Sequence, residues 1–226
     1  MSTGTKHTAF TPGYTPGEEI ANSVTHGAGL LLAVAALVIL TVTATLRGDV
    51  WTVVSSVVFG TTLVLLYGAS TLYHAVRGRR LKALLQVFDH AAIFLLIAGT
   101  YTPFSLVSLR GPWGWSLFGV VWGLAAVGIV SQMTALRRWK KASLALYILM
   151  GWVVIVAVKP LVAALSPGGL ALLAAGGLAY MVGVVFYVWK RLPYHHAVWH
   201  GFVLAGSTLH FLAVLLYVIP GSSTAP

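Results

Sequence analysis

Apolar residues form seven long runs along the chain, and short polar or basic segments separate them. The runs cover about residues 20–46, 51–76, 84–109, 113–136, 143–165, 170–189 and 195–219. Each is close to the roughly 20 residues that a helix needs to cross a bilayer, and none alternates apolar and polar residues as a barrel strand does. The pattern therefore predicts an all-α, polytopic integral membrane protein with seven transmembrane helices.

Composition supports this assignment and indicates a single domain. The chain is 58% hydrophobic and 8% charged, whereas about 25% of the residues in a soluble domain are charged. There is no internal repeat and no long linker, which predicts one transmembrane domain over residues 19–220. Residues 1–18 are expected to form a flexible cytoplasmic tail and residues 221–226 a short outer tail. Pro103 lies inside the third run and predicts a kink there.

The net charge of +10 reflects membrane orientation and does not indicate a nucleic-acid partner, because the basic residues lie in short segments between the apolar runs. With seven spans, Arg47 and Arg110 lie on one side of the membrane. The other side holds eleven lysines and arginines: Lys6, Arg77, Arg79, Arg80, Lys82, Arg137, Arg138, Lys140, Lys141, Lys190 and Arg191. This imbalance predicts a cytoplasmic N-terminus and a C-terminus outside.

Two histidines, His196 and His200, open the last apolar run. Residues four apart lie about 40° apart around a helix, so both rings can face one ion. Ionisable residues in a membrane helix are costly and usually have a function. Since the chain has no cysteine, any metal ligands must be histidine, aspartate or glutamate. We therefore interpret the pair as two ligands of a zinc ion near the cytoplasmic face.

Four polar groups from three of the runs share one depth in the predicted membrane. They are His74, Asp89, His196 and His200. Counting about 1.5 Å per residue from the nearest basic segment places all four roughly 5–14 Å from the cytoplasmic charge line. Successive helices run in opposite directions, so the order of residues does not by itself require this agreement. The common depth predicts a common site.

Each of these groups has a chemical role that fits a zinc centre. Three neutral imidazoles with an open position suit a catalytic zinc ion, and an all-imidazole ligand set favours zinc among the common metals. Asp89 is expected to accept a proton from the bound water or to orient an imidazole. Ser70, one turn before His74, is expected to donate to that water or to a substrate carbonyl. His90 and Tyr101 are further candidates for holding the carbonyl.

Other polar residues have two interpretations each. Single buried histidines often serve packing, which applies here to His26, His90 and His210. His195 is expected to lie in solvent at the interface. One helical face near the chain start carries Glu19, Asn22, Ser23 and His26. This face is expected either to cap the first helix or to close the cytoplasmic mouth of the site.

Several stretches together resemble the haemolysin III family, within the superfamily of progestin and adipoQ receptors and alkaline ceramidases. They are residues 18–27, Ser70-Thr71-Leu72-Tyr73-His74, residues 88–93, residues 99–103, and His196-Ala197-Val198-Trp199-His200 with the later His210. The resemblance implies seven helices with the N-terminus inside. It also implies zinc ligation at His74, His196 and His200, contact with zinc through water at Asp89, and a serine beside the site at Ser70. A location in the plasma membrane, in a bacterium the inner membrane, is expected.

Three functions are compatible with these features. The first is a zinc-dependent hydrolase that cleaves a lipid amide or ester bond, because the resemblance implies ceramidase activity in related branches. The second is a membrane receptor or regulator of lipid homeostasis in which zinc is structural. The third is a pore-forming cytolysin, as the family name suggests, although the polar groups cluster at one end of the helices. The expected partners are a membrane lipid, as substrate or ligand, and the bilayer. The oligomeric state stays open.

Overall fold

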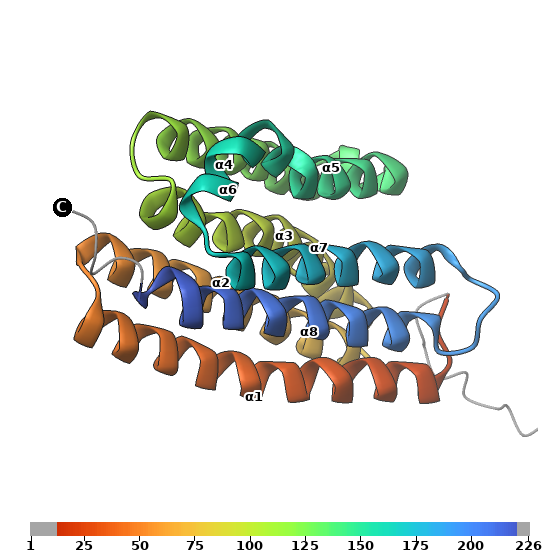
Figure 1. Cartoon of the computed structure of the whole chain (residues 1–226). Helices are drawn as coiled ribbons and strands as arrows, with labels where there is room; N and C mark the ends of the chain where they lie inside the picture. The colour runs from red at the N-terminus through yellow and green to blue at the C-terminus, as the bar shows by residue number, and fades with distance from the viewer. Residues whose placement is uncertain (1–12, 221–226) are drawn as a thin grey trace, which may run out of the picture.

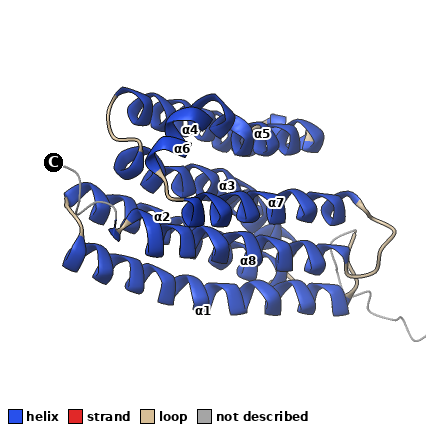
Figure 2. Ribbon diagram, in the orientation of Figure 1, coloured by secondary structure: helices blue, strands red, loops and turns tan. Residues whose placement is uncertain are grey.

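The computed structural model describes residues 13–220, and every regular element within them is helical (Figure 2). Residues 1–12 of the predicted tail and the predicted outer tail, 221–226, lie outside the described part. The first helix begins at Pro16, so it already includes the last residues of the predicted tail. The elements are α1 (Pro16–Arg47), α2 (Val50–Ala75), α3 (Arg79–Pro103), η1 (Phe104–Ser108), α4 (Pro112–Met133), η2 (Ala135–Arg138), α5 (Lys140–Trp152), η3 (Val153–Ala157), α6 (Val158–Ala164), α7 (Pro167–Val188), α8 (His195–Ala213) and η4 (Val214–Val218).

Seven helical segments in the described part are long and apolar enough to cross a membrane, as predicted. The fifth of these segments is a composite of α5, η3 and α6. The third and seventh begin as α-helices and end as the π-helical turns η1 and η4. The predicted all-α, seven-span fold is therefore confirmed.

The helices form a bundle with roughly parallel axes (Figure 1). The last span, α8, packs against both α1 and α7, and α1 also packs along α2. The first and last spans are thus neighbours, although most of the chain separates them. This arrangement brings residues near the start of α1, the end of α2 and the start of α8 to one end of the bundle.

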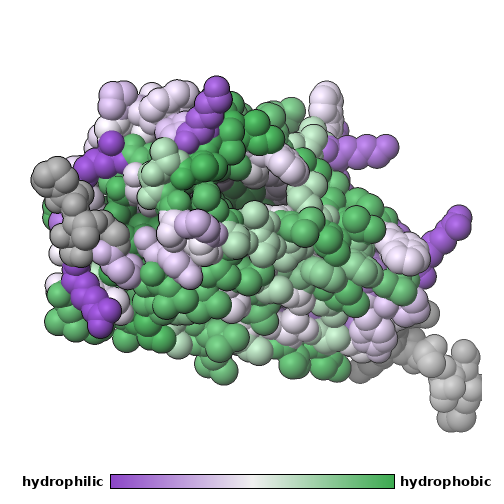
Figure 3. All heavy atoms as spheres, viewed as in Figure 1, coloured by the Kyte–Doolittle hydropathy of each residue, from purple (hydrophilic) through white to green (hydrophobic). Residues whose placement is uncertain are grey.

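The outer surface of the bundle is apolar over most of its length. Figure 3 shows hydrophobic residues over the middle of the molecule and hydrophilic side chains mainly toward its ends. Large aliphatic side chains such as Leu31 and Val156 are 75% and 73% exposed. Exposed apolar area of this extent marks a surface that contacts lipid. The chain is a multi-pass membrane protein.

Helices α1 and α2 each begin at a polar capping residue, Thr15 and Asp49. Thr15 and Glu18 form a reciprocal capping box: the Thr15 hydroxyl accepts from the Glu18 N–H, and the Glu18 carboxylate accepts from the Thr15 N–H at 2.8 Å. Asp49 caps α2 by accepting from the Thr52 N–H at 2.9 Å. Because Thr15 and Glu18 cap α1, the interpretation of the Glu19 face as a helix cap is wrong, and that face turns into the bundle.

A side chain hydrogen-bonds to the backbone groups at a break inside the fifth span. The Tyr101 hydroxyl on α3 donates to the carbonyls of Met150 and Gly151 and accepts from the Val154 N–H, each at 2.9–3.0 Å. These groups belong to the junction between α5 and η3, where the α-helical ladder is interrupted. Unsatisfied backbone groups are costly in lipid, which explains why a tyrosine lies there.

The α-helix α3 ends at Pro103 and continues as the π-helical turn η1. The kink that Pro103 predicts therefore takes the form of a change in helix type.

Candidate metal centre

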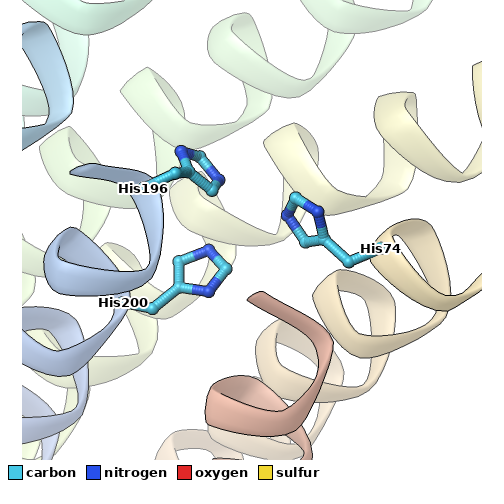
Figure 4. Close-up of side chains that lie close together, drawn as sticks. All are labelled: His74, His196 and His200. Carbon is cyan, nitrogen blue, oxygen red and sulfur yellow. The ribbon is translucent and has the colours of Figure 1, made fainter. Parts of the chain in front are cut away.

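Three histidines from two helices converge at one end of the bundle (Figure 4). His74 lies in the last turn of α2, and His196 and His200 lie in the first two turns of α8. Each offers one ligand atom such that all three atoms lie within 4.8 Å of one another. The ring centroids are 4.5 Å apart for the α8 pair and 5.1 and 5.2 Å from His74 to His196 and His200. All three side chains are buried.

The hydrogen bonds of His74 and His200 each leave one ring nitrogen free for a metal ion. Nε2 of His74, Nδ1 of His196 and Nε2 of His200 are buried without a hydrogen-bond partner. The opposite nitrogens of two rings are engaged: His74 Nδ1 with the Glu19 carboxylate at 2.7 Å, and His200 Nδ1 with the Asn22 carbonyl at 3.3 Å. An imidazole that donates through one nitrogen presents a lone pair on the other, which is how ligating histidines are usually held. The three buried histidines could therefore hold one metal ion.

A buried ion pair supports this centre from α1 and α3. Glu19 is 5% exposed and contacts His74 Nδ1 through Oε2 and Lys82 Nζ through Oε1, the latter at 3.0 Å. Lys82 also donates to the carbonyls of Tyr73 and Val76 at the end of α2, at 2.9 and 3.2 Å. Buried charges are tolerated when they are paired and hydrogen-bonded in this way.

Lys82 was expected in a loop, among the residues that set membrane orientation. It lies instead within α3 and is 5% exposed. The interior acceptors explain the difference, because Glu19 and the two carbonyls replace the water that a loop lysine would contact.

The inward face of α1 lines the centre with two further polar groups. Asn22 is fully buried, and its side-chain amide lies 3.5 Å from His74 Nδ1. The His26 ring stacks on that of His200, with centroids 3.4 Å apart and planes at 14°. Both ring nitrogens of His26 are buried without a hydrogen-bond partner. Glu19, Asn22 and His26 thus contact the histidine cluster directly, which the sequence interpretation left undecided.

Asp89 and Ser70 lie near His74, on α3 and α2. Asp89 on α3 is 6% exposed and close enough to interact electrostatically with His74 and with the Ser70 hydroxyl. Ser70, one turn before His74 on α2, is buried, and its hydroxyl makes no hydrogen bond of good geometry. Among the described residues, the group of possible metal ligands whose atoms lie within 4.8 Å of one another contains only the three histidines. Asp89 is therefore a neighbour of the centre and lies outside its immediate ligand set.

Other candidate residues lie elsewhere. Tyr101 is committed to the backbone of the fifth span, so the idea that it holds a substrate carbonyl is wrong. His195 was expected in solvent but is 5% exposed, and its Nδ1 contacts the Phe186 carbonyl at 3.2 Å. His210 contacts the Leu173 carbonyl at 3.1 Å through Nε2, which is a packing role. The His90 carbonyl accepts from the Tyr147 hydroxyl at 2.9 Å.

The Tyr14 ring packs against the histidine cluster just before α1 begins, a contact that the sequence did not predict. Its ring centroid lies 5.0 Å from that of His196 and 6.1 Å from that of His74. Burial raises the pKa of the Tyr14 phenol above its usual value, with smaller contributions from Tyr73 and other nearby groups. The hydroxyl therefore stays protonated beside the site. In the sequence, Tyr14 stands among proline and glycine residues, which gave no signal of a buried contact.

Comparison with known proteins identifies the family. The family model described as "Haemolysin-III related" matches residues 14–211. "Hemolysin-3" of Bacillus cereus is 49% identical over 206 residues, covering 91% of this chain and 94% of the relative. The "Hemolysin-3 homolog" of Bacillus subtilis (strain 168) is 48% identical over 206 residues, covering 91% and 97%.

A more distant relative supports the wider superfamily of progestin and adipoQ receptors. The human "Monocyte to macrophage differentiation factor" is 30% identical over 207 residues, covering 89% of this chain and 84% of the relative. The family model spans the helices that carry the three histidines as well as α1 and α3. From the family model and these relatives together, the chain belongs to the haemolysin III family.

Proposed function

We propose that this protein is a zinc-dependent hydrolase that cleaves an amide or ester bond of a membrane lipid. The observation that carries the proposal is the set of three buried histidines, each offering one ring nitrogen within 4.8 Å of the other two, with a buried carboxylate and a buried hydroxyl near His74. A zinc ion bound by imidazoles polarises a carbonyl group and makes a coordinated water acidic enough to act near neutral pH.

His74, His196 and His200 hold the ion in this proposal. Glu19 fixes the His74 ring by accepting from Nδ1, and the Asn22 carbonyl does the same for His200. Such partners set the orientation of the ring and the basicity of the ligating nitrogen. The all-imidazole donor set and the absence of cysteine favour zinc among the common metals.

Asp89 acts as the general base and later returns the proton to the leaving group. Its carboxylate is buried and interacts electrostatically with His74 and Ser70, and a carboxylate held near the reacting water can accept its proton. The Ser70 hydroxyl has no protein acceptor of good geometry, so it is available to donate to the carbonyl oxygen of a substrate. The exposed apolar faces around the bundle would let a lipid reach this depth from the bilayer.

The test measures fatty-acid release from ceramides, phospholipids and acyl-amides by purified protein in lipid nanodiscs. Asp89→Asn should lower turnover about 10²–10⁴-fold while the metal content stays unchanged. Asp49→Asn is the matched control, because Asp49 caps α2 at its other end, and it should retain turnover. Wild-type protein that carries its metal ion and releases fatty acid from none of these lipids would refute the hydrolase.

A structural clamp is a second candidate, because the centre joins several helices. The histidines come from α2 and α8, and Glu19 and Lys82 add α1 and α3. In that case zinc would support a receptor or regulator of lipid homeostasis. His196→Ala would then lower the unfolding temperature strongly, and Asp89→Asn would change neither folding nor function.

The names of the two Bacillus relatives suggest cytolysis as a third candidate. Dye leakage from liposomes that continues after removal of the metal would favour it.

The same relatives support a bacterial plasma membrane as the location. The predicted cytoplasmic position of the N-terminus also belongs to this proposal, and cysteine-accessibility labelling on each side of the membrane tests it.

A further inference from the structure

A pocket of about 240 Å³ opens between the start of α1, the end of α2 and the start of α3. Apolar residues of α1, including Ile20 and Val24, line one part of it, and Arg77 and Lys82 line another. We propose that this pocket binds the headgroup of an anionic phospholipid, with the phosphate on the Arg77 guanidinium. The proposal does not depend on the hydrolase, because it rests on Arg77 and the apolar wall, although the pocket shares Glu19 and His74 with the metal centre.

Charge in the pocket favours an anion. Lys82 is neutralised by Glu19 at 3.0 Å, and its remaining donors are used by two carbonyls. Arg77 is exposed, and no hydrogen bond or ion pair involves its side chain within residues 13–220. The pocket therefore carries one uncompensated positive charge, with Arg79 and Arg80 close by in sequence.

No acidic residue of the protein is available to pair with Arg77. The whole chain has four aspartates and glutamates, all in the described part. Glu18 accepts from Thr15 and from the Tyr194 N–H, Glu19 pairs with Lys82, Asp49 pairs with Arg110 at the other end of α2, and Asp89 is buried. A phosphate from outside the protein is the complementary group, and arginine binds phosphate well in a bidentate geometry.

The surroundings of the pocket indicate that this phosphate belongs to a lipid. Ile20 and Val24 line the pocket and are 60% and 66% exposed, and the apolar surface continues along α1 to Leu31. A lipid-facing helix with basic residues at its end is where a headgroup and an acyl chain meet the same protein surface. A free phosphate ion would use the arginine but gain nothing from the apolar wall.

The pocket is separate from the metal-binding point. Glu19 and His74 form part of its wall, but the residues that line it include neither His196 nor His200. A ligand there would contact the α1 and α2 side of the centre. His74, by contrast, points its unpartnered Nε2 toward His196 and His200 on α8 (Figure 4).

Native mass spectrometry of the detergent-solubilised protein tests the proposal by measuring retention of phosphatidylglycerol over a concentration series. Arg77→Gln should weaken retention about tenfold or more, because it removes a charge-assisted hydrogen bond. Arg79→Gln and Arg80→Gln are the controls: they are exposed basic residues of the same segment that do not line the pocket. Each should change retention less than about twofold.

A second pair of variants tests the apolar wall without touching the charge. Val24→Trp should reduce retention by filling the pocket, whereas Leu31→Trp, on the lipid-facing side of α1 away from the pocket, should not. Equal losses for all three arginine variants would mean a nonspecific basic surface and overturn the proposal, as would no loss in any of them. Competition by glycerol phosphate as strong as that by the intact lipid would also overturn it, since the ligand would then be a free phosphate.

Discussion

The Glu19 carboxylate on α1 lies 2.7 Å from Nδ1 of His74 on α2, and both groups are buried. This contact fixes the ring so that Nε2, which has no partner in the protein, faces the other two histidines. A carboxylate behind a ligating imidazole also makes the ligating nitrogen more basic. The relationship gives a polar residue of the first helix a direct influence on metal binding.

Replacing Glu19 with glutamine should therefore weaken metal binding without removing a ligand. Loss of an oriented partner of this kind typically lowers metal affinity about 10–100-fold. Competition with a chelator of known affinity measures the change. Glu18→Gln is the matched control, because Glu18 caps α1 and accepts from the Tyr194 N–H, both of which glutamine can still do. An equal loss of affinity in the two variants would contradict a specific role for Glu19.

Tyr101 is expected to stabilise the fold and to have no effect on the metal centre. Tyr101→Phe removes the partner of the Met150 and Gly151 carbonyls and of the Val154 N–H. Leaving buried polar groups unsatisfied costs about 1–3 kcal/mol. Thermal unfolding in detergent should show a lower midpoint with unchanged metal content. Tyr217→Phe is the control, since Tyr217 is 37% exposed, and it should unfold like the wild type.

Two glycines of α4 should respond oppositely to alanine. A Cβ atom at Gly128 would lie 2.4 Å from the Phe94 ring, which is fully buried, whereas a Cβ atom at Gly123 would meet no packing neighbour within 4 Å. Gly128→Ala should destabilise the protein by about 1–3 kcal/mol through overpacking. Gly123→Ala should be neutral or slightly stabilising because alanine favours a helix. Thermal unfolding of both variants tests this, and equal midpoints would show that α3 and α4 do not pack this closely.

The pairing of Asp49 with Arg110 predicts a specific pH dependence of stability. Burial alone would raise the pKa of Asp49, but hydrogen bonds from Thr52 and the Arg110 guanidinium outweigh it and hold the pKa below its ordinary value. A carboxyl group with a depressed pKa stabilises the folded state above its unfolded pKa, and this contribution is lost as pH falls through the folded pKa.

The wild type should therefore exceed Asp49→Asn in unfolding temperature near neutral pH. The difference should shrink as the pH falls below about 4, the region where an unperturbed aspartate titrates. Asparagine still caps a helix, so the difference reports on the charge of Asp49. A difference that is constant from pH 7 to the acid range would show that the ionised carboxylate contributes nothing.

The seven spans and the histidine cluster could be predicted from local pattern. Apolar length defines a span, and the four-residue spacing of His196 and His200 defines a helical face. Counting residues from the basic segments placed His74 and Asp89 at the same depth, and the structure brings His74 into contact range of the α8 pair. These features depend on helix geometry alone.

The support around the cluster depends on which helices are neighbours, and that information is not local. The sequence allows Glu19 to serve either as a helix cap or as part of the site, and the packing of α1 against both α2 and α8 decides for the site. Lys82 stands in a basic segment, and only the acceptors at the end of α2 and on Glu19 explain its burial. Tyr101 lies near the other candidates in sequence, but its hydroxyl serves a helix break far along the chain.

The central claim is that His74, His196 and His200 hold one metal ion, and metal analysis of purified protein tests it most directly. After dialysis against zinc and removal of excess metal, the wild type should carry one zinc ion per chain. A His196→Ala, His200→Ala double variant should carry almost none, while Asp89→Asn keeps its ion. Wild-type protein that is folded and gains no zinc, or a double variant that retains the full amount, would contradict the claim.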